Sequence, residues 1–194
     1  MVNVWLASDH HIDHENIIRF CGRPFHDVVE MNQKMLALYN ETVKPQDHVY
    51  FLGDVTLRRG GKVDREWFIN EVKRYHGHKR LILGNHDHFP TKTYLEAGFE
   101  KIYGTWRGLG QFIMSHIPLH PTSLGSASAN VHGHIHQNPS PTPVLYIDKE
   151  GRVKSKPYIN VCLEATNYRP IHLDTVNKWI TLAKDEAEGV KVGD

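Results

Sequence analysis

Residues 130–138 read NVHGHIHQN and carry three histidines, His132, His134 and His136, at alternate positions. In an extended segment, side chains two residues apart lie on one face, so this spacing predicts three imidazoles along one side of a strand and its turn. A surface strand has no need of that arrangement, whereas a metal site could use it. Histidine is also the one unusual total of the composition, with 15 residues in 194.

Further candidates for the same chemistry follow three short apolar segments upstream. Asp9 and His11 come after the first segment, Asp54 after the second, and Asn85 and His86 after the third. Open α/β sheets bind ligands at the carboxyl ends of their strands, so we expect these side chains to converge in one crevice. A single Asp after a strand is often a turn former and an isolated His is often a satisfied polar residue, but the repetition favours a metal site.

The elements that must position these residues alternate between strand and helix. Apolar patterns predict strands over residues 2–7, 49–52 and 81–83, and amphipathic helices over residues 27–43 and 63–75. Asp27 and Asp64 are candidate N-caps of the two helices. Short, almost wholly apolar strands that alternate with helices are typical of a parallel sheet covered by helices.

The second half of the chain has a different pattern. We expect two strands on either side of RGLG within residues 101–116, two more around residues 149–151 within 143–164, and a closing helix over residues 173–188. Residues 121–129 and 137–143 are loops by composition, and the last few residues are expected to fray. The mixed sheet is therefore predicted to end in antiparallel strands.

Length, charge and cysteine content limit the class of protein. We expect one domain over residues 1–194. The formal charge of +1 gives no general attraction for nucleic acid or anionic membrane, so any phosphate binding must be local. Cys21 and Cys162 are too few for a disulfide framework and fit structural thiols in a reducing compartment. With neither the apolar core of a secretory signal nor a membrane-spanning apolar run, a cytoplasmic protein is expected.

Five motifs occur in a fixed order: Asp9-x-His11, Gly53-Asp54, Gly84-Asn85-His86-Asp87, His116 and Gly133-His134-x-His136. In these motifs the chain resembles the calcineurin-like metallophosphoesterases, and the resemblance covers residues 9–136. The gaps between the motifs suit a compact member without a cap domain, and residues 158–173 are similar to the tail of small bacterial and phage members. The resemblance implies an α/β fold in which two mixed β-sheets are sandwiched between helices, an αββα sandwich.

The resemblance also implies a binuclear metal centre. One ion would be held by Asp9, His11, Asp54 and His136, and the other by Asp54, Asn85, His116 and His134, with Asp54 as the bridging ligand. These ligand types suit borderline divalent ions, with Mn²⁺ favoured and Fe, Zn²⁺ and Ni²⁺ as alternatives, and the lack of thiolate argues against a structural zinc. Two carboxylates offset only about half of the charge of two divalent ions, which leaves a local attraction for phosphate.

In the implied reaction, two ions about 3.5–4 Å apart share a hydroxide that attacks the phosphorus, and His86 protonates the leaving group as general acid. Asp87 either orients the His86 ring or only shapes the turn. His132 lies outside the family motif, so we expect a supporting role for it, and Gly133 is expected to permit a tight turn. Candidate contacts of the substrate phosphate are His14 and Asn16.

These expectations favour a metal-dependent phosphodiesterase that acts on small substrates such as 2′,3′-cyclic nucleotides. A near-neutral chain without capping or DNA-binding segments argues against long nucleic acid as a substrate and against a membrane partner. A nuclease or phosphomonoesterase of the same family is the alternative enzyme. A non-catalytic metal-binding protein is the alternative from another class. The sequence leaves the natural substrate, the native metals and the oligomeric state open.

Overall fold

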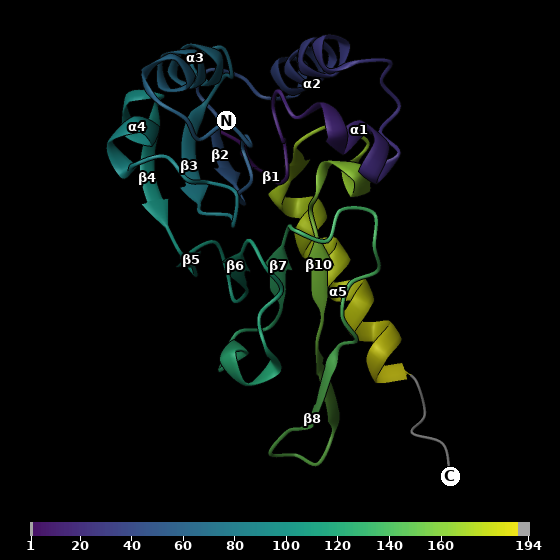
Figure 1. Ribbon diagram of the computed structural model, residues 1–194. Coiled ribbons are helices and arrows are strands. Elements are labelled where there is room, and N and C mark those ends of the chain that lie inside the picture. The colour runs from purple at the N-terminus through teal and green to yellow at the C-terminus, as the bar shows by residue number, and fades with distance from the viewer. Residues whose placement is uncertain (1, 190–194) are drawn as a thin grey trace.

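Two mixed β-sheets form the centre of the molecule, and helices pack around them (Figure 1). The computed structural model describes residues 2–189. In chain order the elements are β1 (Val4–Ala7), α1 (Glu15–Cys21), α2 (Val28–Thr42), β2 (His48–Phe51), α3 (Lys62–Val72), β3 (His78–Ile82), α4 (Thr91–Glu96), β4 (Phe99–Tyr103), β5 (Thr105–Trp106), β6 (Ile113–Ser115), η1 (Pro121–Leu124), β7 (Asn130–His132), β8 (Val144–Ile147), β9 (Val153–Lys156), β10 (Tyr158–Asn160), η2 (Leu163–Thr166), β11 (Ile171–His172) and α5 (Leu173–Gly189). The two η elements are 3₁₀ helices.

The two sheets each combine parallel and antiparallel pairs. The five-stranded sheet has the order β11-β1-β2-β3-β4, in which β1 to β4 are parallel and β11 is antiparallel to β1. The four-stranded sheet has the order β10-β7-β6-β5, and β5 is antiparallel to β6. The expected α/β class with two mixed sheets and helices is therefore confirmed. The hairpin of β8 and β9 forms a separate two-stranded sheet that projects from the body (Figure 1).

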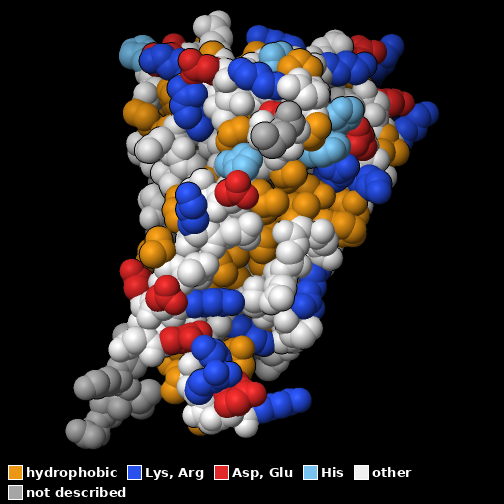
Figure 2. All heavy atoms as spheres, turned by 180° about the vertical axis from the view of Figure 1, so that it is seen from behind, with side chains coloured by type: hydrophobic (Ala, Val, Ile, Leu, Met, Phe, Trp, Pro, Cys, Tyr) orange, Lys and Arg blue, Asp and Glu red, His pale blue; other side chains and the backbone are white. Residues whose placement is uncertain are grey.

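Alternate side chains of the central strands pack on opposite sides of the five-stranded sheet. In β2, Val49 and Phe51 join a core cluster with residues of α2, α3 and α4, whereas Tyr50 joins a second cluster that also contains residues of the four-stranded sheet. α5 contributes Val176 and Ile180 to the second cluster. The period of two in the strand therefore gives the sheet one face for helices and one face for the other sheet. Seen from behind, apolar side chains gather across the middle of the molecule (Figure 2).

The predicted helix caps have different outcomes. The Asp27 carboxylate accepts a hydrogen bond from a backbone N–H of the first turn of α2, as expected. The prediction for Asp64 is wrong, because α3 begins after Gly61 and Asp64 lies inside its first turn. Its carboxylate instead binds the Gly60 N–H at 2.9 Å and the Arg58 guanidinium at 2.8 Å.

Several short elements are absent from the sequence-based prediction. α1 and α4 have only 7 and 6 residues and no side-chain hydrogen bond at the N-cap, so neither gives a periodic or capping signal. β11 has two residues. β3 begins at His78 rather than Leu81, because its first residues pair with β2 although they are polar. The expected fraying of the chain end lies outside the described residues. None of the described helices is long and apolar enough to cross a membrane.

Candidate metal centre

The loops that follow β1 and β2 run side by side and carry the first site residues. The Asp9 N–H donates to the Gly53 carbonyl at 3.0 Å, and the His11 N–H donates to the Asp54 carbonyl at 3.0 Å. Since β1 and β2 are parallel neighbours, their carboxyl ends reach the same edge of the sheet. The convergence predicted from the strand ends is therefore observed for these two loops.

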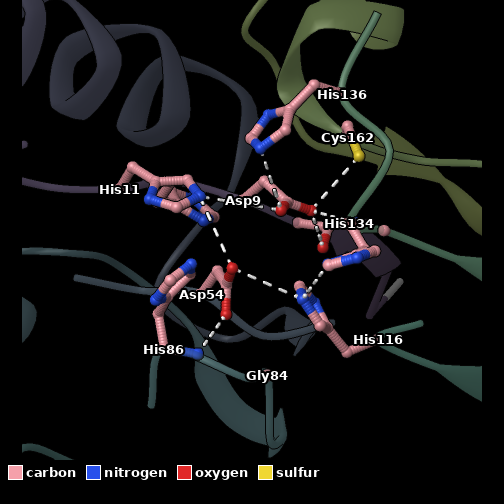
Figure 3. Close-up of polar contacts among 12 residues, drawn as sticks. Asp9, His11, Asp54, Gly84, His86, His116, His134, His136 and Cys162 are labelled. Carbon is pink, nitrogen blue, oxygen red and sulfur yellow. Dashed lines mark hydrogen bonds and ion pairs between the residues drawn. The ribbon is translucent and has the colours of Figure 1, made fainter. Parts of the chain in front are cut away.

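Two groups of side chains at this edge are each compact enough to hold a metal ion. One group consists of Asp9, His11 and His136, and the other consists of Asp54, His116 and His134. Within each group the ligand atoms lie within 4.8 Å of one another, and Figure 3 shows the side chains directed toward a common centre. Asn85, the remaining candidate ligand, lies beside the second group, with its Oδ1 2.9 Å from His116 Nε2.

Asp54 lies between the two groups. Its Oδ2 is 3.5 Å from His11 Nε2 and 3.4 Å from His116 Nε2. Its Oδ1 accepts a hydrogen bond from the His86 N–H at 2.9 Å. One oxygen is thus fixed by the backbone while the other faces both groups, which is the arrangement expected of a bridging ligand.

Buried polar atoms at the centre have no hydrogen-bond partner among the residues that the structure describes. These atoms are Asp9 Oδ1 and His11 Nε2, which lie 3.8 Å apart in side chains that are almost fully buried. His136 Nε2 is 3.7 Å from the same Asp9 oxygen. An unpaired buried polar atom costs about 1–3 kcal/mol. Carboxylate and imidazole atoms that face one another in this way fit a divalent cation as the missing partner.

The second carboxylate oxygen of Asp9 is fixed by three donors. Oδ2 accepts hydrogen bonds from the Ser8 hydroxyl at 2.6 Å, the His134 N–H at 2.8 Å and the Cys162 thiol at 3.2 Å. Because these contacts occupy Oδ2, the carboxylate keeps the orientation that directs Oδ1 toward the centre. Cys162 thus has a structural role, as expected for a buried thiol.

Residues 130–138 do not form the extended segment that the histidine spacing predicted. β7 ends at His132, and His134 and His136 have φ angles of 73° and 51°, so the two side chains leave a turn and join different groups. His132 is fully buried, and its ring lies 2.9 Å from the Gly133 carbonyl, in keeping with a supporting role. The reason for Gly133 differs from the expected one. Its φ is not positive, but a Cβ there would overlap the two side chains that follow β1.

Asp87 acts on the turn that carries the site. Its carboxylate accepts hydrogen bonds from the backbone N–H groups of Gly84 at 2.8 Å, Asp54 at 2.9 Å and Val55 at 3.1 Å. Burial raises the pKa of Asp87 to about 6, although these hydrogen bonds oppose the shift. Of the two roles left open by the sequence, orienting the His86 ring or shaping the turn, the geometry favours the second.

An open cavity of about 480 Å³ lies beside the first group and is lined by His11, His14, His86 and His136. His14 Nδ1 is 3.2 Å from His11 Nδ1. Asn16 is exposed and lines a different surface depression, on another side of α1. The structure therefore brings His14 and His86 to the centre but not Asn16.

Glu164, in η2, is a site residue that the sequence did not reveal. Its Oε1 is 3.0 Å from His136 Nδ1 and accepts a hydrogen bond from Arg23 Nε at 2.9 Å. Arg23 in turn donates to the carbonyls of Asp9 at 2.7 Å and His10 at 2.9 Å. With Nδ1 turned to Glu164, Nε2 of His136 faces the centre. Glu164 is 28 residues from His136 and 141 from Arg23, so no local spacing signals the contact.

A third group of potential ligands, Cys21, His136 and Glu164, shares its histidine with the first group. Burial raises the pKa of the Cys21 thiol to about 11, so it is protonated at neutral pH. A protonated thiol is a poor metal ligand. We therefore assign Glu164 to the orientation of His136 rather than to a separate ion.

The ionisable side chains of the candidate metal centre favour positive charge in their neighbourhood. Burial raises the pKa of Asp9, but the nearby imidazoles of His11, His116 and His136 outweigh it, so the pKa lies well below its usual range. The pKa of Asp54 is lowered in the same way, against burial, mainly by its close contact with the His116 imidazole. Burial lowers the pKa of His116, but the two carboxylates raise it to about 9. Two buried carboxylates thus keep a neighbouring histidine protonated at neutral pH.

Comparison with known proteins finds a relative that matches almost end to end. The uncharacterized protein MJ1445 of Methanocaldococcus jannaschii is 34% identical over 187 residues, which cover 95% of this chain and 94% of the relative. The chain belongs to the same family as this archaeal protein. No family model matches the sequence.

Other similar proteins extend the comparison. The Gene 66 proteins of Mycobacterium phages D29 and L5 are 36% and 35% identical over 102 and 88 residues, which cover 50% and 45% of this chain and 46% and 41% of the phage proteins. The crystal structure of AQ665 from Aquifex aeolicus, a protein of unknown function, superposes with a TM-score of 0.67 at 25% identity. This match covers 92% of this chain and all of AQ665, so the fold is shared over nearly the whole molecule.

Proposed function

We propose that the protein is a calcineurin-like metallophosphoesterase that hydrolyses small phosphodiesters with two divalent metal ions. The observation that carries the proposal is the pair of ligand groups joined by Asp54, the first of which contains the unpaired buried atoms Asp9 Oδ1 and His11 Nε2. A structural metal site would close its coordination shell with protein atoms. Here the first group borders an open cavity, which suits a site that must admit water and substrate.

The residues of the two groups would hold the ions. The first ion would take Asp9, His11 and His136, the second would take His116, His134 and Asn85, and Asp54 would serve both. When bound, two such ions supply an activated water and an electrostatic clamp on the phosphoryl oxygens. Mn²⁺ is the favoured ion, because imidazole, carboxylate and amide oxygen together suit borderline metals.

The remaining groups of the cavity have roles that do not require metal ligation. His86 lies on the cavity wall with its ring 5.7 Å from that of His11, measured between centroids, so it is available to protonate the leaving oxygen. His14 lines the same cavity and is available to bind a phosphoryl oxygen. Small diesters are favoured over long nucleic acid, because the net charge is close to zero and the attraction for phosphate is local.

The proposal is tested with protein that has been stripped of metal and reloaded with Mn²⁺. We expect hydrolysis of bis(4-nitrophenyl) phosphate to exceed that of 4-nitrophenyl phosphate. We expect His86→Ala to lower diester turnover by about 10²–10⁴-fold without loss of bound Mn²⁺, since general acid catalysis contributes about that much. His88→Ala, an exposed histidine in the same turn, is the matched control and should keep normal turnover.

Each of three results would contradict the proposed phosphodiesterase and indicate another function. Good monoester hydrolysis with no diester hydrolysis would make the protein a phosphomonoesterase. Release of nucleotides from labelled oligonucleotides in preference to small diesters would make it a nuclease. Stoichiometric Mn²⁺ binding with no turnover of any of these esters would leave a non-catalytic metal-binding protein.

A further inference from the structure

The cavity beside the candidate metal centre has two unlike walls. One wall consists of imidazoles from the centre and its surroundings, as described above. The other wall is apolar and consists of Ile17, Phe20, Cys21 and Leu57. At about 480 Å³ the cavity is within the range that holds small organic ligands. A phosphate alone would use only the imidazole wall, so the apolar wall requires another explanation.

The apolar wall comes mostly from one face of α1. His14, Ile17, Phe20 and Cys21 are spaced by three or four residues around this short helix, so their side chains lie on the same side. Ile17 is buried and anchors the helix in a small core cluster with residues of α2. Phe20 is 59% exposed. The helix therefore presents a large aromatic side chain to solvent directly beside a strongly polar site.

We infer that this wall binds a planar aromatic group carried by the phosphoester, with Phe20 as its stacking partner. The inference rests on the proposed function for the position of the phosphate. Ring centroids of His11 and His14 are 5.3 Å apart, and those of His14 and Phe20 are 6.4 Å apart. Phe20 is thus separated from a candidate metal ligand by the His14 ring, and the group that links phosphate and ring would span that separation.

Two sources of such a ring share this chemistry, a nucleobase and a simple aryl ester. The exposed amides of Gln137 and Asn138 line the same cavity and can form hydrogen bonds with the edge of a base. A phenyl ring offers no such edge. Stacking on Phe20 is common to both sources, whereas the two amides would favour the nucleobase.

Three methyl phosphodiesters without any other aromatic group separate these contributions in Mn²⁺-loaded protein. They are thymidine 5′-(methyl phosphate), methyl phenyl phosphate and dimethyl phosphate, here called the thymidine, phenyl and methyl esters, and their hydrolysis is followed by ³¹P nuclear magnetic resonance. We expect Phe20→Ala to raise KM for the thymidine and phenyl esters by about tenfold, the usual scale of base stacking on an aromatic side chain. KM for the methyl ester should change by less than about twofold. Phe20→Trp should restore KM, and Gln137→Ala should affect the thymidine ester alone.

Tyr146→Ala is the matched control, because Tyr146 is an aromatic side chain on the projecting hairpin that is 43% exposed. It should leave KM unchanged for all three esters. Equal effects of Phe20→Ala on the methyl and thymidine esters, or no effect on either, would overturn the inference. Since Phe20 is mostly exposed, the variant should fold normally, and circular dichroism would verify this.

A binding measurement separates failure of the subsite from failure of the proposed function. Titration calorimetry with adenosine 5′-monophosphate and ribose 5-phosphate should show tighter binding of the nucleotide, and Phe20→Ala should remove the difference. That result without turnover of any ester would refute the phosphodiesterase and support the aromatic subsite. Diester turnover with equal binding of the two phosphates would support the enzyme and refute the subsite.

Discussion

Glu164→Leu is expected to weaken metal binding at the group that contains His136 by about 10–100-fold, the usual effect of removing the hydrogen-bond acceptor of a ligating histidine. The Glu164 carboxylate lies 3.0 Å from His136 Nδ1, while His136 Nε2 faces Asp9 at 3.7 Å. Without the carboxylate, neither the tautomer nor the ring orientation of His136 is fixed. Leu has a volume similar to that of Glu, so the change removes charge and acceptor without a large cavity.

The same substitution is expected to lower stability, because it leaves a buried guanidinium without its anion. The Arg23 side chain is fully buried, and two of its guanidinium nitrogens contact the same oxygen, Glu164 Oε1, at 2.8 and 2.9 Å. Breaking a buried pair costs about 3–5 kcal/mol. Arg23 keeps its hydrogen bonds to two backbone carbonyls, so we expect the lower end, about 3 kcal/mol. For a domain of this size that corresponds to a melting temperature about 6–12 °C lower.

Two measurements separate the two effects. Thermal unfolding of metal-free protein reports stability, and calorimetric titration with Mn²⁺ reports affinity. In Arg23→Met combined with Glu164→Leu both charges are absent, but the Asp9 and His10 carbonyls also lose their donor. Stability should therefore recover only in part, while Mn²⁺ affinity stays low. Glu164→Gln keeps an acceptor oxygen and should lose less affinity than Glu164→Leu. Glu100→Leu is the control variant, because it removes a more exposed contact between Glu100 and His78. It should change the free energy of unfolding by less than about 1 kcal/mol.

Either of two outcomes would refute the proposed role of Glu164 in orienting His136. Mn²⁺ affinity of Glu164→Leu equal to that of the parent protein would mean that the carboxylate does not orient His136. Recovery of affinity together with stability in the double variant would mean that Glu164 acts on the metal centre only through the general integrity of the fold.

Three further substitutions test other parts of the structure. Gly133→Ala is expected to weaken Mn²⁺ binding and to lower the free energy of unfolding in urea by about 1–3 kcal/mol, because the added methyl group overpacks the end of β1. An unchanged midpoint of urea unfolding would contradict this crowding. His134→Ala and His136→Ala should each remove one of the two proposed ions, measured as metal content per chain. His132→Ala should lower stability and keep both ions, and equal metal loss from all three variants would show that His132 is misassigned. Asp47→Asn should cost about 2–3 kcal/mol at neutral pH, because the buried Asp47 carboxylate accepts four hydrogen bonds. Burial raises the pKa of Asp47, but the hydrogen bonds lower it by more, so the pKa in the folded protein lies below the unfolded pKa of about 4. The stabilisation by Asp47 is therefore complete above the unfolded pKa and is lost as the pH falls through the folded pKa. The unfolding curves of variant and parent should therefore converge in acid, and a constant difference would refute the assignment.

Much of the fold and most of the candidate ligand groups could be predicted from the sequence, because both depend on local patterns. The apolar segment that became β2 is short and continuous, as expected for a buried parallel strand, and its polar continuation places Asp54 at the edge of the sheet. The Asp27 cap and the period of α2 are likewise local signals. The site follows from the same information, because the ends of neighbouring parallel strands must meet.

The parts that could not be predicted depend on contacts between distant segments. Glu164 reaches His136 only because η2 packs beside the turn after β7, and a lone Glu in a short polar segment carries no signal of that contact. α1 is too short for its pattern to stand out, although it supplies the apolar wall with Phe20. Gly133 was expected to permit a tight turn, whereas the crowding that requires a glycine there is visible only when β1 and β7 are placed together.

The backbone conformation of the candidate metal centre helps to decide whether its residues are turn formers or metal ligands. Five of the seven candidate ligands have φ between 48° and 73°, namely Asp9, His11, Asp54, His134 and His136. Non-glycine residues in this region cost about 1 kcal/mol or more each, and they persist only where the surrounding structure imposes the conformation. Glycine would remove that cost at every one of these positions, so turn formation alone would favour it. The side chains that stand there instead all direct carboxylate or imidazole atoms toward one centre, and retaining them against the conformational cost is what a requirement for their chemistry predicts.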